Sequence, residues 1–234
     1  SDLGTQSSTF SEAYTIARQF LSLDHLSKGR AGWNAVTSRS GQEHYGLEEL
    51  PPHEQRYERA AETAAAVKLL WESWAQDAIV LDKEQGVYAS PEKITEAEFN
   101  GIHIKVKGAL PSPRSVQGRP VIVQAGSSDQ GRDFAAQYAD IVFTMQPSAE
   151  EAKAFYRDVK ERAVKYGRKQ DELKVFQGIT PFAADTAAKA EEIKKKLDAL
   201  TDYGYALQRF KQIFKKLDIE LGQLDQPLNL DQLK

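Results

Sequence analysis

Residues 32–38 read Gly-Trp-Asn-Ala-Val-Thr-Ser, a short apolar run that ends in two hydroxyl side chains. Two comparable junctions follow along the chain, His-Glu-Gln-Arg-Tyr at 53–57 and Gln-Ala-Gly-Ser-Ser-Asp-Gln-Gly at 124–131. Each junction lies where a strand is expected to end or a helix to begin. In an α/β barrel, that edge is where separate loops assemble the active site. The three junctions therefore predict an α/β barrel with its site at this edge.

Working outward from these junctions, the chain alternates between apolar runs and stripes of apolar residues at helical spacing. The first stripe starts near Ser11, which we expect to be the N-cap, and a Ser148/Glu151 capping box opens a later helix. Strands are expected at 5–8, 30–37, 120–124, 141–144 and 173–177. Helices are expected at 11–27, 57–74, 148–166 and 186–200, with another that starts near 131 and includes 134–136. Such alternation indicates a parallel sheet with right-handed crossovers.

One part of the chain breaks this rhythm. Residues 77–118 carry short β-type runs, several prolines and glycines and no long helical stripe, so we expect an insertion there. We treat residues 1–234 as a single partial barrel domain, with an irregular tail at about 201–234. Trp71 and Trp74, one helical turn apart, are interpreted as a packing ridge because each indole can bury a large area.

Composition limits the classes of function. The formal net charge is −3 and the pI is about 5.9, which argues against a nucleic-acid binder, because phosphate neutralisation needs an excess of Lys and Arg. There is no cysteine, so disulfides and thiolate metal sites are excluded, and no metal site is predicted. No apolar run approaches the ~20 residues of a membrane span. We expect a cytoplasmic protein whose partners are small molecules.

The junction at 124–131 is the first candidate for chemistry. Gly126, Ser127 and Ser128 stand directly after a strand and ahead of a helix, where backbone N–H groups and hydroxyls can bind a phosphate at the positive helix end. The alternative is an ordinary turn, in which Gly126 supplies a positive φ and Ser128 or Asp129 caps the helix. The sequence pattern leaves both interpretations open.

Three further residues are candidates. His53 and Tyr57 are four apart at a helix start, so they share a face and could reach one ligand. Alternatively, Tyr57 begins the core stripe and His53 is solvated. Asn34 lies in an apolar strand, where its amide must find a hydrogen bond or cost about 1–3 kcal/mol. A cofactor or a neighbouring loop could supply that bond.

These stretches together resemble one family. Residues 23–38, the His53-x-x-x-Tyr57 pair and residues 120–128 are similar to the bacterial luciferase-like monooxygenases, in the branch of nitrilotriacetate monooxygenase, pristinamycin synthase and dibenzothiophene sulfone monooxygenase. The resemblance extends from about Thr5 to about Leu200. It implies a TIM (β/α)₈ barrel with an insertion, incomplete here because the first two strands and the last strand have no counterpart.

The resemblance also implies a cofactor and partners. Family members use reduced FMN, delivered by a separate NAD(P)H-dependent flavin reductase, to activate O₂ and oxygenate a small organic substrate. Carried over by position, Thr5 and Ser7 would lie beside the flavin, with Asn34 near its ring system. His53, Tyr57, Gly126, Ser127 and Ser128 would surround its phosphate. No residue is assigned a catalytic role, and we expect a homo-oligomer.

Two other classes of function remain open. The chain could be a non-catalytic flavin or phosphate-binding barrel, or a truncated one that acts as an interaction subunit, which the missing strands favour. A barrel hydrolase or aldolase would need a carboxylate pair, a metal cluster or a Schiff-base lysine at the strand ends, and the pattern provides none of these. The identity of the substrate is not encoded in any motif.

Overall fold

The computed structural model describes residues 2–202, 204–208 and 210. The chain divides into two compact units, residues 1–179 and 180–234. The first unit carries the sheet, its covering helices and the insertion, and the second contains helix α5 (Ala187–Ala199). Most of the predicted tail at 201–234 falls outside the described residues. No described helix is both long and apolar enough to cross a bilayer.

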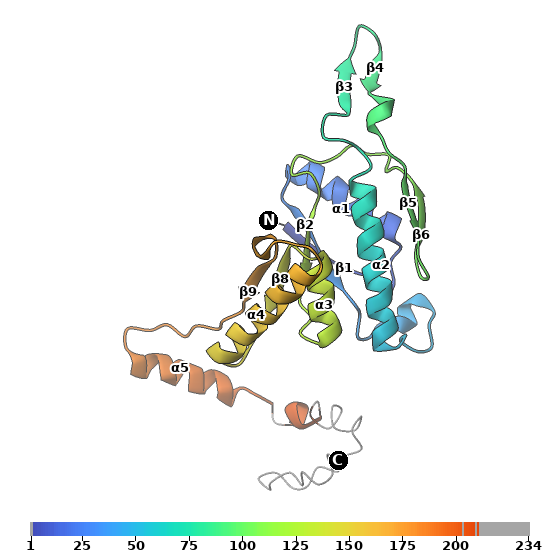
Figure 1. Cartoon of the computed structure of the whole chain (residues 1–234). Coiled ribbons are helices and arrows are strands. Elements are labelled where there is room, and N and C mark those ends of the chain that lie inside the picture. Colours follow the sequence, from blue (N-terminus) through green and yellow to red (C-terminus); the bar gives the residue numbers. More distant parts are fainter. Residues whose placement is uncertain (1, 203, 209, 211–234) are drawn as a thin grey trace. The chain divides into compact units, whose positions relative to one another are not determined.

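The first unit is built on a five-stranded parallel sheet with the order β1-β2-β7-β8-β9 (Figure 1). The strands are β1 (Asp2–Ser7), β2 (Ala31–Val36), β7 (Val121–Gln124), β8 (Ile141–Thr144) and β9 (Lys174–Gln177). Among the described residues, β1 and β9 each pair with one neighbour only, so the sheet has two open edges. The predicted parallel α/β alternation is confirmed.

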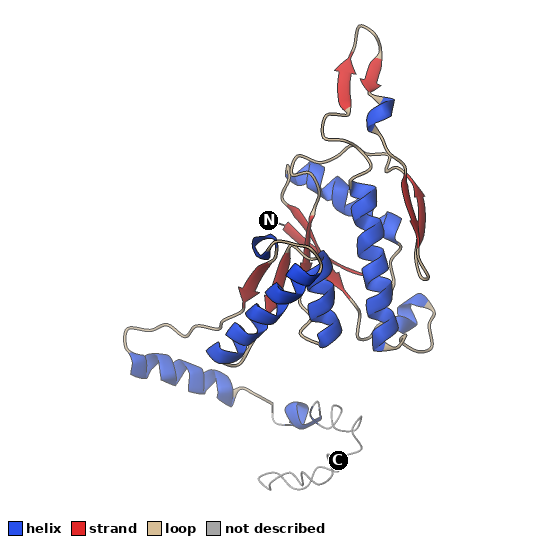
Figure 2. Ribbon diagram, in the orientation of Figure 1, coloured by secondary structure: helices blue, strands red, loops and turns tan. Residues whose placement is uncertain are grey.

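Four helices cover one face of this sheet (Figure 2). They are α1 (Ala13–Ser27), α2 (His53–Trp71), α3 (Asp129–Tyr138) and α4 (Ala149–Lys165), joined to the strands in part by the short 3₁₀ turns η1 (Gln42–Tyr45) and η3 (Gln170–Glu172). Strand side chains alternate between the two faces. Trp33 and Ile122 point towards the helices and are fully buried, whereas their neighbours Asn34 and Val123 point to the opposite face, called here the inner face.

Trp33 is the centre of the core. Its ring lies 6.3 Å from that of Phe20 on α1 and 6.4 Å from that of Trp71 on α2. Its indole N–H donates to the carbonyl of Gln6 at 3.0 Å, which ties β2 to β1 as well. Trp71 and Trp74 are both buried, as the packing interpretation predicts. A buried indole whose N–H is satisfied stabilises the fold through area and hydrogen bonding together.

Residues 77–118, the segment expected to be an insertion, contain two antiparallel hairpins. β3 (Ile79–Asp82) pairs with β4 (Val87–Ala89), and β5 (Ala97–Asn100) pairs with β6 (Lys105–Gly108). A 3₁₀ turn, η2 (Pro91–Lys93), connects them. In Figure 1 the β3–β4 hairpin projects from the unit, while β5–β6 runs alongside α2.

Two details of the predicted helices are wrong. Ser11 is not the N-cap of α1: the N-cap is Glu12, without a side-chain cap, because the Ser11 hydroxyl instead accepts from the Gln6 amide at 3.3 Å. Helix α2 ends at Trp71, so Trp74 is not helical; its indole N–H donates to the carbonyl of Leu110 at 2.8 Å. In both cases a contact from outside the helix competes with the local helical pattern.

Glu62 on α2 holds the insertion in place. Its carboxylate accepts the backbone N–H groups of Ile102, His103 and Ile104 at 2.7–2.9 Å. Burial acts to raise the pKa of Glu62, but these three donors and the nearby His103 outweigh it, and the net pKa is lowered. Gly101 is required beside them, because a Cβ there would lie 2.3 Å from the carboxylate.

We expect Glu62→Gln to lower the free energy of unfolding by about 1–3 kcal/mol, because an amide cannot accept all three N–H groups. Since the folded pKa of Glu62 is lowered, its stabilisation is present above the ordinary carboxyl pKa and is lost as the pH falls through the folded one. Urea denaturation from pH 3 to 7 measures both effects. The control is Glu58→Gln, whose carboxylate has the His103 ring, at 3.4 Å, as its one hydrogen-bond partner among the described residues. Equal losses in the two variants would contradict the anchoring role.

Candidate functional site

A pocket of 340 Å³ lies where β2 and β7 end and α2 and α3 begin. It therefore gathers all three junctions that the sequence singles out, from segments far apart in the chain. Its lining contains two arginines, a histidine and several hydroxyl groups but no Asp or Glu: Ala35, Val36, Thr37, Ser38, Arg39, His53, Arg56, Tyr57, Gln124, Ala125, Gly126, Ser127 and Ser128. A concave site with convergent polar groups of positive charge is suited to an anion.

Two glycines allow Tyr57 to approach the β7–α3 loop. A Cβ on Gly126 would lie 2.7 Å from the Tyr57 hydroxyl and 2.4 Å from the Gln124 amide nitrogen, and a Cβ on Gly131 would lie 3.0 Å from the same hydroxyl. Gly126 does not have the positive φ that the simple-turn alternative assigns to it. Because Gly126 has no side chain, the Tyr57 hydroxyl from helix α2 can lie against the loop backbone.

The two serines of this loop differ in what they do. Ser128 is the N-cap of α3, and its hydroxyl accepts the Gly131 N–H at 3.2 Å, as the turn alternative predicts. Ser127 is exposed at the pocket, and its carbonyl accepts from Arg132 at 3.0 Å. The cap fixes the start of α3 at the pocket wall, so the positive end of the helix faces the cavity.

His53 and Tyr57 are brought together as predicted. Their ring centroids lie 4.9 Å apart on the first turn of α2, and both residues line the pocket. His53 is exposed, whereas Tyr57 is half-buried and also packs edge-on against Phe134 of α3, with centroids 6.4 Å apart. Tyr57 thus belongs to both the core and the pocket, which combines the two alternatives.

Thr5 and Asn34 form a second polar group, on the inner face. The two residues are paired in the β1–β2 register, and the Asn34 amide N–H donates to the Thr5 hydroxyl at 3.0 Å. The amide oxygen of Asn34 is buried and has no hydrogen-bond partner among the described residues. A neighbouring strand therefore satisfies only half of this amide, and a buried acceptor remains available to a ligand.

Ser7 connects the two polar groups. Its hydroxyl accepts from the Ser38 hydroxyl at 2.7 Å and from the Thr9 backbone N–H at 3.2 Å. Ser38 in turn lines the pocket at the end of β2. The predicted residues thus lie in two adjacent places, Thr5, Ser7 and Asn34 on the inner face and His53, Tyr57, Gly126, Ser127 and Ser128 around the pocket, joined through Ser38.

Arg56 lines this pocket but is absent from the predicted set. It is only 8% exposed, and one guanidinium nitrogen donates to the carbonyl of Ser38. The sequence contained a signal for Arg56. A positive charge in the first turn of α2 is unfavourable beside the positive end of the helix dipole, so an arginine there indicates a role outside the stability of the helix.

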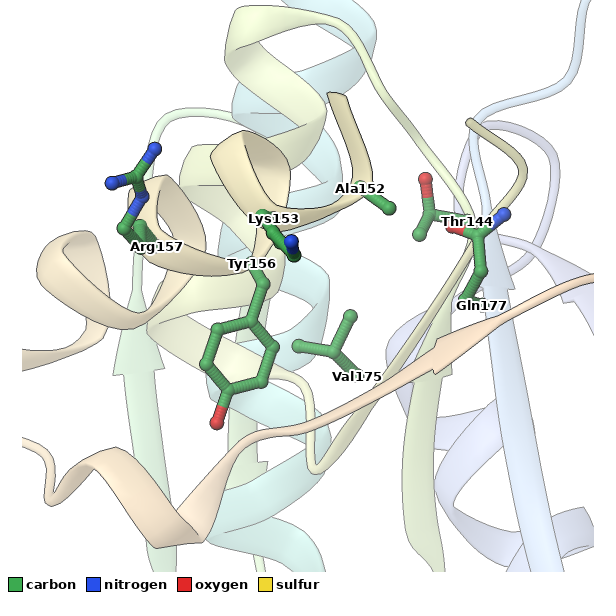
Figure 3. Close-up of a pocket in the computed structure, with 7 residues that line it drawn as sticks. All are labelled: Thr144, Ala152, Lys153, Tyr156, Arg157, Val175 and Gln177. Carbon is green, nitrogen blue, oxygen red and sulfur yellow. The ribbon is translucent and has the colours of Figure 1, made fainter. Parts of the chain in front are cut away.

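A second, larger pocket of 460 Å³ contains none of the predicted residues. It lies between α4 and the ends of β8 and β9, and Figure 3 shows Tyr156 beside Val175 at one end and Thr144 near Gln177 at the other. Val175 and Thr144 project to the helix-covered side of the sheet, away from the inner face. Lys153 and Arg157 line it, but size and charge alone do not make it the better candidate, because no residue of the three junctions reaches it. Nowhere in the described ranges do three or more His, Cys, Asp or Glu side chains gather as metal ligands would.

The family model for luciferase-like monooxygenases matches residues 8–227. The chain belongs to the luciferase-like monooxygenase family. It is 42% identical to N-acetyl-S-(2-succino)cysteine monooxygenase of Bacillus subtilis (strain 168) over 96% of this chain and 51% of that protein. It is 41% identical to nitrilotriacetate monooxygenase component A of Aminobacter aminovorans, over 97% of this chain and 51% of the relative.

Among solved structures, the chain is similar to riboflavin lyase (RcaE), which was determined with modified FMN and the substrate riboflavin. The TM-score is 0.77 with 33% identity, covering 82% of this chain and 44% of that one. The chain spans about half the length of the curated relatives it matches. The fold is therefore part of the TIM barrel of this family, and its five parallel strands are a partial barrel, as the resemblance predicts.

We expect Gly131→Ala to lower stability by about 1–3 kcal/mol, because the new methyl group would press on the Gly126 backbone, 3.0 Å away, which cannot move aside as a flexible side chain can. The measurement is the urea midpoint. Gly204→Ala is the control, since within the described part of the chain its methyl group would meet the Asp202 carboxylate alone, at 3.2 Å. Equal midpoints for the two variants would show that the glycine contact is unimportant.

Proposed function

We propose that this chain carries the FMN site of a flavin-dependent monooxygenase, which takes reduced FMN from an NAD(P)H-dependent flavin reductase and uses O₂ to oxygenate a small organic substrate. The observation that carries the proposal is that the cationic pocket and the polar group on the inner face lie next to each other, with Ser38 between them. A pocket at the start of α3 suits a phosphate, and the unsatisfied Asn34 amide oxygen lies on the next strand's inner face. FMN has a phosphate at one end and a polar ring system at the other.

The residues divide between these two ends. Tyr57, His53 and Ser127 would bind the phosphate, together with the backbone N–H groups of the first turn of α3, which Ser128 and Gly126 hold in place. Thr5, Ser7 and Asn34 would contact the flavin beyond the ribityl chain. The Asn34 oxygen is an acceptor, so it fits a ring N–H better than a carbonyl.

When bound and reduced, FMN supplies the electrons for the reaction with O₂. The chain's own residues then need only bind, orient and exclude water. Within the described residues no hydrogen bond joins His53 to a serine of the lining, as a nucleophile and its general base would require. The Thr5–Asn34 hydrogen bond fixes the amide orientation, so that the acceptor is presented without reorganisation.

The similarity to nitrilotriacetate monooxygenase component A supports a two-component system with a separate reductase. The similarity to a structure containing modified FMN supports the choice of flavin. The substrate, a homo-oligomeric assembly and a location in the cytoplasm are parts of this proposal that no residue specifies.

A second candidate is a non-catalytic interaction subunit. It is favoured by apolar side chains on the inner face, where Phe143 and Phe176 are paired in the register and are 40% and 55% exposed. Large exposed apolar groups commonly mark a contact surface.

The test is an FMN titration of this chain beside the longest polypeptide of its reading frame, followed by fluorescence quenching and thermal stability. Bound FMN stabilises by RT ln(1 + [L]/Kd), about 2.7 kcal/mol at 100 times Kd. Binding by both supports the proposal, and binding by the longer one alone assigns the site to the whole protein. If neither binds, the proposal fails and the interaction subunit replaces it.

We expect Tyr57→Phe to weaken FMN binding about 3- to 10-fold, the effect of one lost hydrogen bond. Unfolding free energy should change little, because no hydrogen bond of the Tyr57 hydroxyl is found within residues 2–202, 204–208 and 210. Fluorescence titration measures the Kd for FMN, and urea denaturation measures the free energy of unfolding. Tyr45→Phe, on an exposed ring that stacks on Phe10 outside the pocket, is the control. An unchanged Kd in Tyr57→Phe would remove this residue from the phosphate site.

A further inference from the structure

Arg56 is a buried cation without a carboxylate partner. Its side chain is 8% exposed and its Nε is buried. Among the described residues, Nε has no hydrogen-bond partner, and the guanidinium donates only to the Ser38 carbonyl. None of the ion pairs formed within the described part of the chain includes it. Two other partly buried arginines show the usual compensation: Arg119 pairs with Asp140, and Arg162 pairs with three carboxylates.

The surroundings of Arg56 increase the imbalance. Burial is the main cause of its lowered pKa, the Tyr57 phenol partly opposes this, and nearby Arg39 lowers it further. The positive ends of α2 and α3 both face the pocket, and no lining residue is acidic. Because a guanidinium keeps its proton, the charge cannot be relieved by titration. A buried charge without a counter-charge is unfavourable, so the lining of this pocket favours an anion as its ligand.

Arg56 is also placed to act on the rest of the site. It holds the Ser38 carbonyl, and the Ser38 hydroxyl donates to Ser7 at 2.7 Å on the inner face beside Asn34. Hydrogen bonds therefore link Arg56 through Ser38 to Ser7, which lies two residues from Thr5 on the same face of β1. A phosphate that pairs with Arg56 would be fixed relative to the strand that presents Asn34.

We propose that Arg56 is the residue that makes this site select a phosphorylated flavin over an unphosphorylated one. This inference rests on the proposed function and adds to it a basis for cofactor selectivity. The hydroxyls of Tyr57 and Ser127 can contact any polar end group, whereas a buried guanidinium requires a negative charge. Riboflavin, which ends in a neutral hydroxyl, would leave Arg56 uncompensated.

The experiment measures Kd for FMN and for riboflavin with the longest polypeptide of the reading frame and its variants. In the parent protein, we expect FMN to bind more tightly than riboflavin. In Arg56→Gln, we expect the ratio of the two Kd values to fall about 10- to 100-fold, the effect of one charge-assisted contact. Arg56→Lys, which keeps the charge without the planar fork, should lose less of the ratio than the glutamine variant.

Arg39→Gln is the matched control, because Arg39 lines the same pocket but is exposed. Its charge is screened by solvent, so its effect on the ratio should be under about 3-fold and should vanish in high salt. A merely structural role of Arg56 would weaken both flavins equally and leave the ratio unchanged, which would overturn the proposal while FMN binding still upheld the proposed function.

Inorganic phosphate serves as an independent probe. It should raise the thermal midpoint of the parent protein and of Arg39→Gln but not that of Arg56→Gln. If the parent binds neither flavin, the proposed function fails and flavin selectivity fails with it. Phosphate stabilisation that depends on Arg56 would then show an anion site for a different ligand. Phosphate stabilisation that persists in Arg56→Gln would overturn the role of Arg56 as the anion partner.

Discussion

The alternation of side chains along β2 is the constraint on which the rest of the structure depends. Trp33 must face the helices, because its ring fills the space between Phe20 and Trp71. The next residue, Asn34, therefore lies on the inner face, away from helices α1 to α4, which cannot supply a hydrogen bond to its amide there. A slip of one residue would bury the amide among aromatic rings and expose the indole. The core thus decides where the polar group of the site lies.

Parallel pairing extends this constraint to the loops. Because β1, β2 and β7 run in the same direction and in register, their carboxyl ends meet at one edge. Ser7, Ser38 and the 124–128 turn meet there although they come from distant parts of the chain. The first turn of α2 closes the same edge through Tyr57 and Arg56. Positive helix ends, hydroxyls and a guanidinium are concentrated there, and acidic groups are absent from the lining.

Close approach of backbone is the second requirement of the site. At Gly126 and Gly131 the loop and Tyr57 lie so close together that a methyl group on either glycine would not fit. The same device recurs at Gly101, where the missing side chain admits the Glu62 carboxylate that holds the insertion. In both places a glycine lets a side chain from α2 reach a backbone segment. Helix α2 thus organises the site at its start and the insertion near its middle.

The sequence by itself determined the alternation of strands and helices, the β-type runs within residues 77–118, the Ser148 cap of α4, the option of a Ser128 cap on α3, and the junctions that meet at the site. These features depend on local periodicity and turn chemistry, which neighbouring residues encode. Tertiary structure alone decided three features. The Ser11 hydroxyl accepts a hydrogen bond from Gln6 instead of capping α1, the missing side chain of Gly126 lets Tyr57 approach the loop, and Arg56 is buried without a counter-charge among the described residues. Each of these depends on a contact between segments distant in the chain, and no local pattern records which surfaces the fold will bring together.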